Sequence, residues 1–268
     1  MHISMKSFQV IPFILLLAAA FTSLPATAQS SADKGLSIAK AAEKADEGFK
    51  SSSVELKMIL KNKQGQVSER LMSNRTLELT ADGDKSLITI ESPRDVKGTS
   101  TLTFTHKEGS DDQWLYLPSI KRVKRISSDN KSGPFMGSEF AYEDLSSQEV
   151  EKYTYKYLKD ATFNGEATQV VERDPVDAKS GYTRQIVWYN PAKGYRLEKI
   201  EFYDRKNALL KTLTYDDYKQ YLGKHWRAGK MTMTNHQSGK STELLFNDYQ
   251  FDAGLTDADF TQNSLRRS

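Results

Sequence analysis

The fold is decided by a stretch that reads Val54-Glu55-Leu56-Lys57-Met58-Ile59-Leu60, followed by the turn sequence Asn62-Lys63-Gln64-Gly65. Apolar residues at every second position from Val54 lie on one face of an extended chain, which is the pattern of a half-buried strand. A short polar turn that contains glycine then reverses the chain. Together the two stretches predict the first half of an antiparallel hairpin.

The same alternation recurs along most of the chain. Turn signals rich in Gly, Asn and Asp separate the runs at residues 81–84, 107–110, 164–165, 190–194, 204–207, 222–224 and 236–239. Short alternating runs between such turns predict an antiparallel meander of about 11 to 13 strands. The second half contains no ten-residue helical pattern, so the sequence does not favour a parallel β/α architecture. The expected fold class is therefore mainly β, in a single domain.

The N-terminus has the three parts of a secretory signal. Lys6 supplies a positive charge, residues 10–21 are apolar, and Ala26-Thr27-Ala28 fits a signal-peptidase site. The alternative is a membrane anchor, but the apolar run is shorter than the ~20 residues that a span needs. We therefore expect a cleaved signal over residues 1–28, a mature domain over residues 29–268, and a location in the periplasm. The chain has no Cys, which excludes disulfides and a lipid-modified cysteine anchor.

The mature chain is predicted to open with a helix. Ile38, Ala42, Ala45 and Phe49 form one apolar stripe, and Asp33 stands where an N-cap is expected. The stripe either packs on the sheet or covers an opening in it.

Catalytic and metal-binding patterns are missing. There is no nucleophile motif or phosphate loop, and the mature chain has only His106, His225 and His236, none at zinc-ligand spacing. Acidic residues at 82–84 and 111–112 fit ordinary turns. A net charge of +3 does not point to nucleic acid. We expect a binding protein, not an enzyme, with no cofactor and no metal.

Residues 114–118 read Trp-Leu-Tyr-Leu-Pro. The strand period places Trp114 and Tyr116 on one face and Leu115 and Leu117 on the other, so both faces are apolar. Such a strand is either an ordinary central strand, or one covered by the core on one side and by a helix, a lid or a ligand on the other.

A basic run follows that strand. Lys121, Arg122, Lys124 and Arg125 lie within six residues. They fit a solvated edge strand, or a surface that docks onto a partner or a lipid headgroup.

Residues 127–147 break the strand rhythm and predict an inserted loop with a short helix. Its stretch Gly133-Pro134-Phe135-Met136-Gly137-Ser138 places a soft apolar pair between glycines. Phe140 and Tyr142 follow closely. These side chains form either a movable lid or the buried anchor of a surface loop.

These motifs together resemble the outer-membrane lipoprotein-sorting protein family, the LolA-like periplasmic carriers. The resemblance rests on residues 114–118, 121–126, 135–138 and 142–145, with further matches at 92–93, 97–99 and 255–260. It implies an incompletely closed antiparallel β-barrel, a half-cup with helices over its opening. It also implies a function, the binding of acyl chains of a lipoprotein or lipid and their transport toward the outer membrane. This branch of the family implies an inner-membrane exporter of the resistance-nodulation-division (RND) type as a partner.

The resemblance assigns roles to the residues named above. It implies that Pro134, Phe135 and Met136 belong to the lid, and it makes Trp114, Tyr116, Leu117, Phe140 and Tyr142 lipid-binding candidates. The archetypal carrier locks its lid with an arginine in a Lys-Arg-Pro context; the corresponding stretch here, near residues 80–83, has none. The alternative hypothesis is an accessory subunit that docks on an exporter through Lys121, Arg122, Lys124 and Arg125 and carries nothing.

Overall fold

The computed structural model describes residue 1, residues 29–127 and residues 130–266. The predicted signal peptide and its cleavage site lie outside the described residues, apart from Met1. In the part of the chain that is described, no helix has the length and apolar character needed to cross a membrane.

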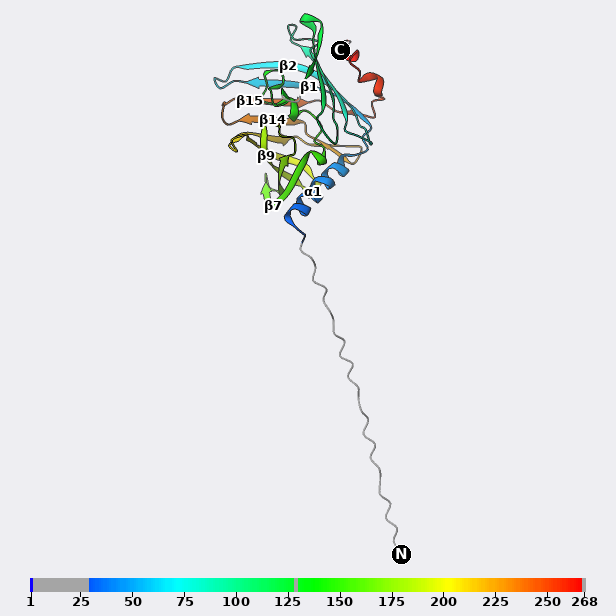
Figure 1. Ribbon diagram of the computed structural model, residues 1–268, viewed down its shortest axis with the longest axis vertical. Coiled ribbons are helices and arrows are strands. Elements are labelled where there is room, and N and C mark those ends of the chain that lie inside the picture. The colour runs from blue at the N-terminus through cyan, green and yellow to red at the C-terminus, as the bar shows by residue number, and fades with distance from the viewer. Residues whose placement is uncertain (2–28, 128–129, 267–268) are drawn as a thin grey trace.

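One α-helix and sixteen strands make up the described chain (Figure 1). The helix is α1 (Ser31–Asp46), and the strands are β1 (Ser51–Lys61), β2 (Val67–Leu77), β3 (Lys85–Ser92), β4 (Ser100–Phe104), β5 (Asp112–Leu117), β6 (Arg122–Ile126), β7 (Tyr153–Phe163), β8 (Glu166–Pro175), β9 (Tyr182–Asn190), β10 (Arg196–Asp204), β11 (Leu209–Asp216), β12 (Lys219–Tyr221), β13 (His225–Arg227), β14 (Lys230–Asn235), β15 (Ser241–Phe246) and β16 (Gln250–Phe251). Single 3-10 turns are η1 (Pro118–Ile120), η3 (Phe135–Gly137), η4 (Tyr142–Asp144), η5 (Val150–Lys152), η6 (Pro191–Lys193), η7 (Asp257–Asp259) and η8 (Ser264–Arg266).

The predicted class, mainly β and antiparallel, is confirmed, but the predicted number of strands is wrong. Three of the sixteen strands, β12, β13 and β16, have only two or three residues. A segment that short has no period of two for the sequence to reveal. β12 pairs only with β13, and the other strands form one sheet of fourteen.

The order of strands across the sheet is β6-β5-β4-β3-β2-β1-β15-β14-β11-β10-β9-β8-β7, with β16 paired to β1. From β1 in the middle of the sheet, the first six strands follow one another to the edge at β6. The chain then continues at the opposite edge, at β7, and the later strands of the sheet follow from there back to the middle. The two edge strands, β6 and β7, do not pair with each other in the described sheet, so hydrogen bonds do not close it into a barrel. This agrees with the expected incomplete closure.

The two edges are consecutive in the chain, although they lie at opposite ends of the sheet. The residues between β6 and β7 must therefore cross from one edge to the other. We call residues 130–152 the inserted segment. It runs along the face of the sheet that carries Leu56, Met58 and Met72, which we call the inner face.

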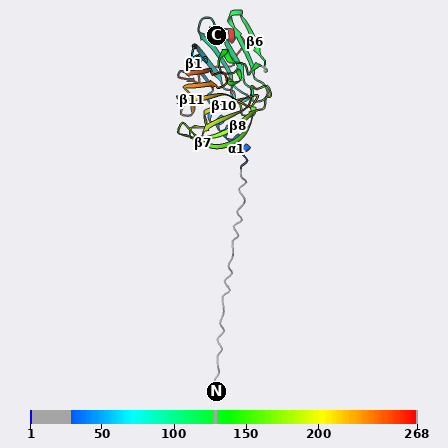
Figure 2. The ribbon, with the colours of Figure 1, turned by 90° about the vertical axis from the view of Figure 1, so that its left-hand side faces the viewer.

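Helix α1 lies against β7 at one edge of the sheet (Figures 1 and 2). Its N-cap is Ser30, whose side chain accepts a hydrogen bond from the Asp33 backbone N–H, so Asp33 is not the cap as expected. A Cβ on Gly35 would lie 2.8 Å from the backbone nitrogen of Tyr157, so only glycine permits this close approach. Ile38 is buried against the inner face, as the stripe predicts, but Phe49 lies beyond the end of the helix.

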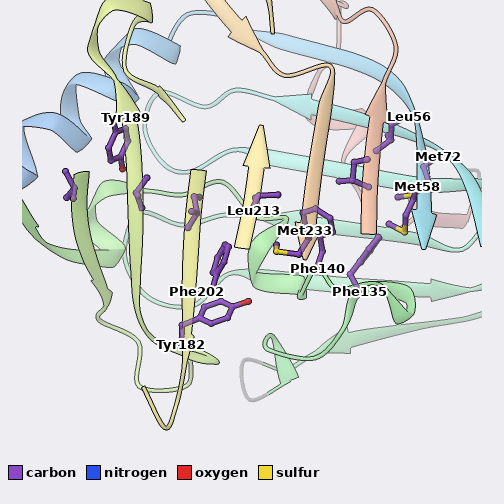
Figure 3. Packing of buried hydrophobic residues seen from close by; sticks show 14 of the residues in the cluster. Leu56, Met58, Met72, Phe135, Phe140, Tyr182, Tyr189, Phe202, Leu213 and Met233 are labelled. Atoms are coloured by element: carbon purple, nitrogen blue, oxygen red, sulfur yellow. The ribbon is translucent and has the colours of Figure 1, made fainter. Parts of the chain in front are cut away.

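The main core gathers side chains from strands at both halves of the sheet and from the inserted segment (Figure 3). Because β2 and β9 contribute to one cluster, the sheet must curl around it. Its buried members are Ile38, Leu56, Met58, Met72, Ile90, Phe135, Phe140, Val171, Tyr182, Val187, Tyr189, Ile200, Phe202, Leu213, Met233 and Leu244.

Candidate functional site

The inserted segment fills the inner face with two aromatic rings. Phe135 and Phe140 are each 1% exposed, and Figure 3 shows Phe140 beside Met233 of β14. The ring of Phe135 also packs edge-to-face on Tyr142, with centroids 5.5 Å apart. The resemblance implies an acyl-binding cavity inside the half-cup. In the structure, the protein's own side chains fill this inner face.

The expected short helix in residues 127–147 is not present in the described part of that range. The described residues there contain no α-helix, and their 3-10 turns include η3 and η4, of three residues each. Met136 and Gly137 adopt left-handed conformations, with φ of 49° and 74°, and such residues cannot continue a right-handed helix. The predicted helical lid is thus corrected to an irregular loop that still carries the predicted apolar residues.

Polar contacts hold the backbone of the inserted segment on the sheet. Arg70 of β2 donates to the carbonyl oxygen of Met136. The Glu139 N–H donates to Thr242 Oγ1 over 3.0 Å, and Asn235 Nδ2 donates to Glu139 Oε2 over 2.7 Å. All three side chains project from the inner face.

The sequence near residues 80–83 lacks the arginine of the archetypal carrier, and in the structure Arg70 of β2 is an arginine that contacts the inserted segment. The sequence itself contains a signal for the position of Arg70. Arg70 pairs with Met58 and stands two residues before Met72, so alternation places it on the apolar face of β2. A cation on a buried face needs a partner, and that criterion would have identified it.

A buried ion pair makes the strongest polar contact of the segment. Lys211 Nζ lies 2.6 Å from Asp144 Oδ2, and the two side chains are 4% and 2% exposed. Lys211 also donates to the Glu139 carbonyl over 2.8 Å, and Tyr182 donates to Asp144 Oδ1 over 2.8 Å. The pair is well satisfied, so losing one partner would leave a buried charge at a cost of about 3–5 kcal/mol.

Acidic side chains gather where the segment ends, near α1. Burial raises the pKa of Glu149 to about 7, with a further contribution from the Asp84 carboxylate, and burial raises the pKa of Asp84 to about 6. Burial also raises the pKa of Glu43. Carboxylate oxygens of Glu43, Glu149 and Glu151 lie within 4.8 Å of one another. Oxygen atoms in such a group are the kind that a divalent cation accepts, and the raised pKa values of two of them favour shared protons.

The seven apolar and aromatic candidates for lipid binding do not form one site. Phe135, Met136, Phe140 and Tyr142 belong to the inner cluster, and alternation with the buried Gln113 turns Leu117 toward the same face.

Trp114 and Tyr116 lie on the opposite face of the sheet. There they pack with Leu102 beneath Phe260 and Leu265 of the C-terminal segment. Strand β5 is thus covered on both faces, as its sequence requires, but its outer cover is the chain's own C-terminus.

The four basic candidates lie at the β6 edge of the sheet, and all are exposed. Arg122 and Lys124 project to one side of the strand. Arg125 projects to the other, where it forms an ion pair with Asp112. Lys121 occupies the left-handed position of the tight turn that follows η1.

Two pockets flank the inserted segment. One, of about 390 Å³, is lined by Lys107, Gln148, Tyr153 and neighbouring polar residues. The other, of about 400 Å³, is lined by Arg70, Gly137, Glu139 and Thr242 among others. Both are bounded by residues that hold the segment in place.

The open curled sheet with an occluded inner face is a LolA-like fold, and solved structures share it. A Vibrio parahaemolyticus protein described as an outer membrane lipoprotein-sorting protein domain is 58% identical, with a TM-score of 0.86 over 88% of this chain and 100% of that one. A DUF1329 family protein from Desulfovibrio piger is 26% identical, with a TM-score of 0.83 over 88% and 99%. A LolA superfamily protein from Nitrosomonas europaea is 22% identical, with a TM-score of 0.69 over 86% and 98%.

The chain therefore belongs to the outer-membrane lipoprotein-sorting protein family. A family model described as "Uncharacterized protein" also matches residues 82–267. Among curated proteins, none matches the chain.

The acidic cluster generates a pH prediction. Because the pKa of Glu149 is raised in the folded state from 4.5 to about 7, the native protein holds a proton that the unfolded chain releases. Folding stability should therefore fall as the pH rises from about 4.5 to 7. We expect Glu149→Gln to flatten this dependence and to raise the free energy of unfolding at pH 8 by roughly 1 kcal/mol, after discounting for solvent screening.

Urea unfolding at pH 5 and pH 8 measures the effect. The matched control is Glu151→Gln, an exposed neighbour that should keep the wild-type dependence. Parallel curves for the wild type and Glu149→Gln across this range would contradict the assignment.

Proposed function

We propose that this protein is a periplasmic carrier whose inner face binds acyl chains of a lipid or lipoprotein. In the empty, closed state the inserted segment occupies that face. An acyl chain takes the place of Phe135 and Phe140, and the segment moves away to admit it. The carrier shuttles its cargo toward the outer membrane, and release returns the segment to the sheet.

The observation that carries the proposal is that part of the buried core is supplied by the inserted segment and not by the strands. Phe135 and Phe140, two of the largest fully buried side chains, come from an irregular segment and not from the sheet. Apart from its apolar contacts, that segment is joined to the sheet and its adjoining loops by side-chain hydrogen bonds and by ion pairs of Lys131, Asp144 and Lys152. Such a plug can leave without breaking the strand pairing. The similar Vibrio parahaemolyticus and Nitrosomonas europaea proteins support the assignment by their descriptions.

The free energies of burial are compatible with an exchange between an acyl chain and the inserted segment on the inner face. Burying an acyl chain of ~14 carbons gives about 11 kcal/mol, at about 0.8 kcal/mol per methylene, before the costs of association. Exposing Phe135 and Phe140 forfeits about 1.5–3 kcal/mol each, and the polar contacts of the segment add to this loss. A competing plug therefore lowers the net affinity, as a carrier that must release its cargo requires.

Met136 and Tyr142, which pack against the inner cluster, and Leu117, which faces the same side of β5, complete the proposed acyl site. Trp114 and Tyr116 are left out of it, because the C-terminal segment covers them on the outer face.

Weakening the plug should strengthen cargo binding. We expect Phe135→Ala to destabilise the empty protein by about 3–5 kcal/mol and to raise its affinity for a fluorescent acyl probe, because the competitor loses a buried ring. Fluorescence titration with the probe, beside urea unfolding, measures both effects.

Phe260→Ala is the matched control. It removes a ring that is 2% exposed from the outer cluster, so stability should fall without a gain in probe affinity. A wild-type protein that binds no acyl probe, or equal affinity changes in the two variants, would contradict the carrier proposal.

The exposed cations at the β6 edge support a second candidate function, docking on an inner-membrane exporter of the RND type without carriage of lipid. Lys121, Arg122 and Lys124 form no ion pair within the described chain, so they are available to an acidic partner surface.

If the protein docks on such an exporter through this edge, a variant with Gln at all four positions should no longer co-purify with it. The positions are Lys121, Arg122, Lys124 and Arg125. Four exposed lysines elsewhere, Lys40, Lys61, Lys206 and Lys240, give a control of equal charge. Co-purification that survives the first set of changes excludes the basic edge as the docking surface. Loss of the exporter with no lipid on the wild-type protein favours docking over carriage.

A further inference from the structure

Arg173 of β8 is a buried cation on the inner face without a carboxylate partner. It is 4% exposed, and within the described chain its side chain donates hydrogen bonds to the neutral Gln185 and Gln148. A guanidinium stays charged in proteins, and a buried charge without a counter-ion is costly. A neutral residue would fill this position at lower cost, so the charge calls for a functional reason.

Among the described residues, no carboxylate forms an ion pair with Arg173, and its direct contacts are with dipoles and an aromatic ring. Its Nε donates to Gln185 Oε1 over 2.8 Å, and its guanidinium lies 4.5 Å from the centre of the Tyr153 ring. Burial raises the pKa of Tyr153 and of Tyr189, so both phenols stay neutral. The positive charge is left uncompensated.

Gln148, on the inserted segment, provides the remaining acceptor. Its Oε1 receives hydrogen bonds from Arg173 Nη2 over 3.2 Å and from the Tyr153 hydroxyl over 2.5 Å. Two donors of the sheet thus converge on one oxygen that the segment contributes. Gln148 and Tyr153 also line the pocket of about 390 Å³, so this oxygen lies at an accessible wall.

Arg173 belongs to a polar row that crosses the inner face. The strand register aligns Arg173, Gln185, Phe202, Lys211 and Asn235 on β8, β9, β10, β11 and β14.

The other two donors of this row, Lys211 and Asn235, also meet oxygens of the inserted segment. Lys211 meets the Asp144 carboxylate at 2.6 Å, and Asn235 meets that of Glu139 at 2.7 Å. If the segment leaves, both carboxylates leave with it, and Lys211 joins Arg173 as an unpaired cation.

We propose that this row binds the anionic headgroup of the cargo, a carboxylate or phosphate attached to an acyl chain. In the closed state Gln148 occupies the place of that headgroup at Arg173, while Asp144 and Glu139 pair with the donors further across the row. The inference rests on the proposed carrier function and names its substrate class. Arg173 is the principal contact, because its geometry suits the two oxygens of an anion.

The neighbouring row fits the tail of the same molecule. The next row on the inner face lies two residues away on each strand. It aligns Val171, Val187, Ile200, Leu213 and Met233. These side chains are all buried and apolar. A charged row beside an apolar row is the arrangement that an anionic amphiphile requires.

A pair of probes with equal chains tests the proposal at pH 8. Palmitate is anionic, and monopalmitoylglycerol is neutral. We expect the wild type to bind palmitate more tightly by roughly tenfold, the effect of a charge-assisted hydrogen bond. Arg173→Gln should lower palmitate affinity by about tenfold and change the affinity for monopalmitoylglycerol less than twofold.

Arg184→Gln is the matched control, because Arg184 projects from the outer face of β9 and pairs with Glu172. It should change neither affinity. Equal effects of Arg173→Gln on both probes, or no effect on either, would overturn the headgroup assignment while leaving the carrier in place. A wild type that binds neither probe would overturn the carrier function, and with it this inference.

Gln148→Glu tests the same site without removing the buried charge. It places a carboxylate against Arg173, so we expect a higher melting temperature for the empty protein and weaker palmitate binding. An unchanged preference for palmitate in this variant would contradict the role of Gln148 as a substitute for the headgroup.

Inorganic phosphate gives the last comparison. If phosphate alone binds as tightly as palmitate and requires Arg173, the row recognises a free anion, and the amphiphile assignment is wrong.

Discussion

The two edge strands of the sheet, β6 and β7, follow one another in the chain and lie at opposite ends of the strand order. This constraint shapes the rest of the molecule. A connection between them has to cross the inner face, and a segment lying there can fill the core only if it brings apolar side chains with it. Phe135 and Phe140 meet that demand. Because the sheet is already paired strand to strand without it, the segment is structurally separable from the fold that it completes.

The same segment also supplies hydrogen-bond acceptors to the cations of the inner face. Arg70, Lys211 and Arg173 project from the sheet into a region of low water content, and the segment supplies the oxygens that satisfy them. Apolar filling and polar satisfaction are therefore both provided by residues that are near one another in sequence. Moving the segment would open a hollow that is apolar in one row and positive in the next. Shape and charge then select the same kind of guest, an acyl chain with an anionic end.

Sequence reasoning recovered what local patterns encode. The alternation from Val54 to Leu60 predicts β1, and the stripe through Ile38 predicts α1. It failed where distant residues decide the outcome. The faces of Trp114 and Leu117 are distinguishable by alternation, but which face is inner depends on the C-terminal segment, which lies more than a hundred residues away. Lys211 gives no sign in sequence of its pairing with Asp144.

The central claim is that the inserted segment and the cargo compete for the inner face. Amide hydrogen exchange of the intact protein measures this most directly. In the closed state, the amides of Phe135, Glu139 and Tyr142 are hydrogen-bonded. With saturating palmitate, the account predicts faster exchange over residues 133–146, while β11 and β14 stay as protected as before. Unchanged or slower exchange over residues 133–146 with palmitate bound would contradict it.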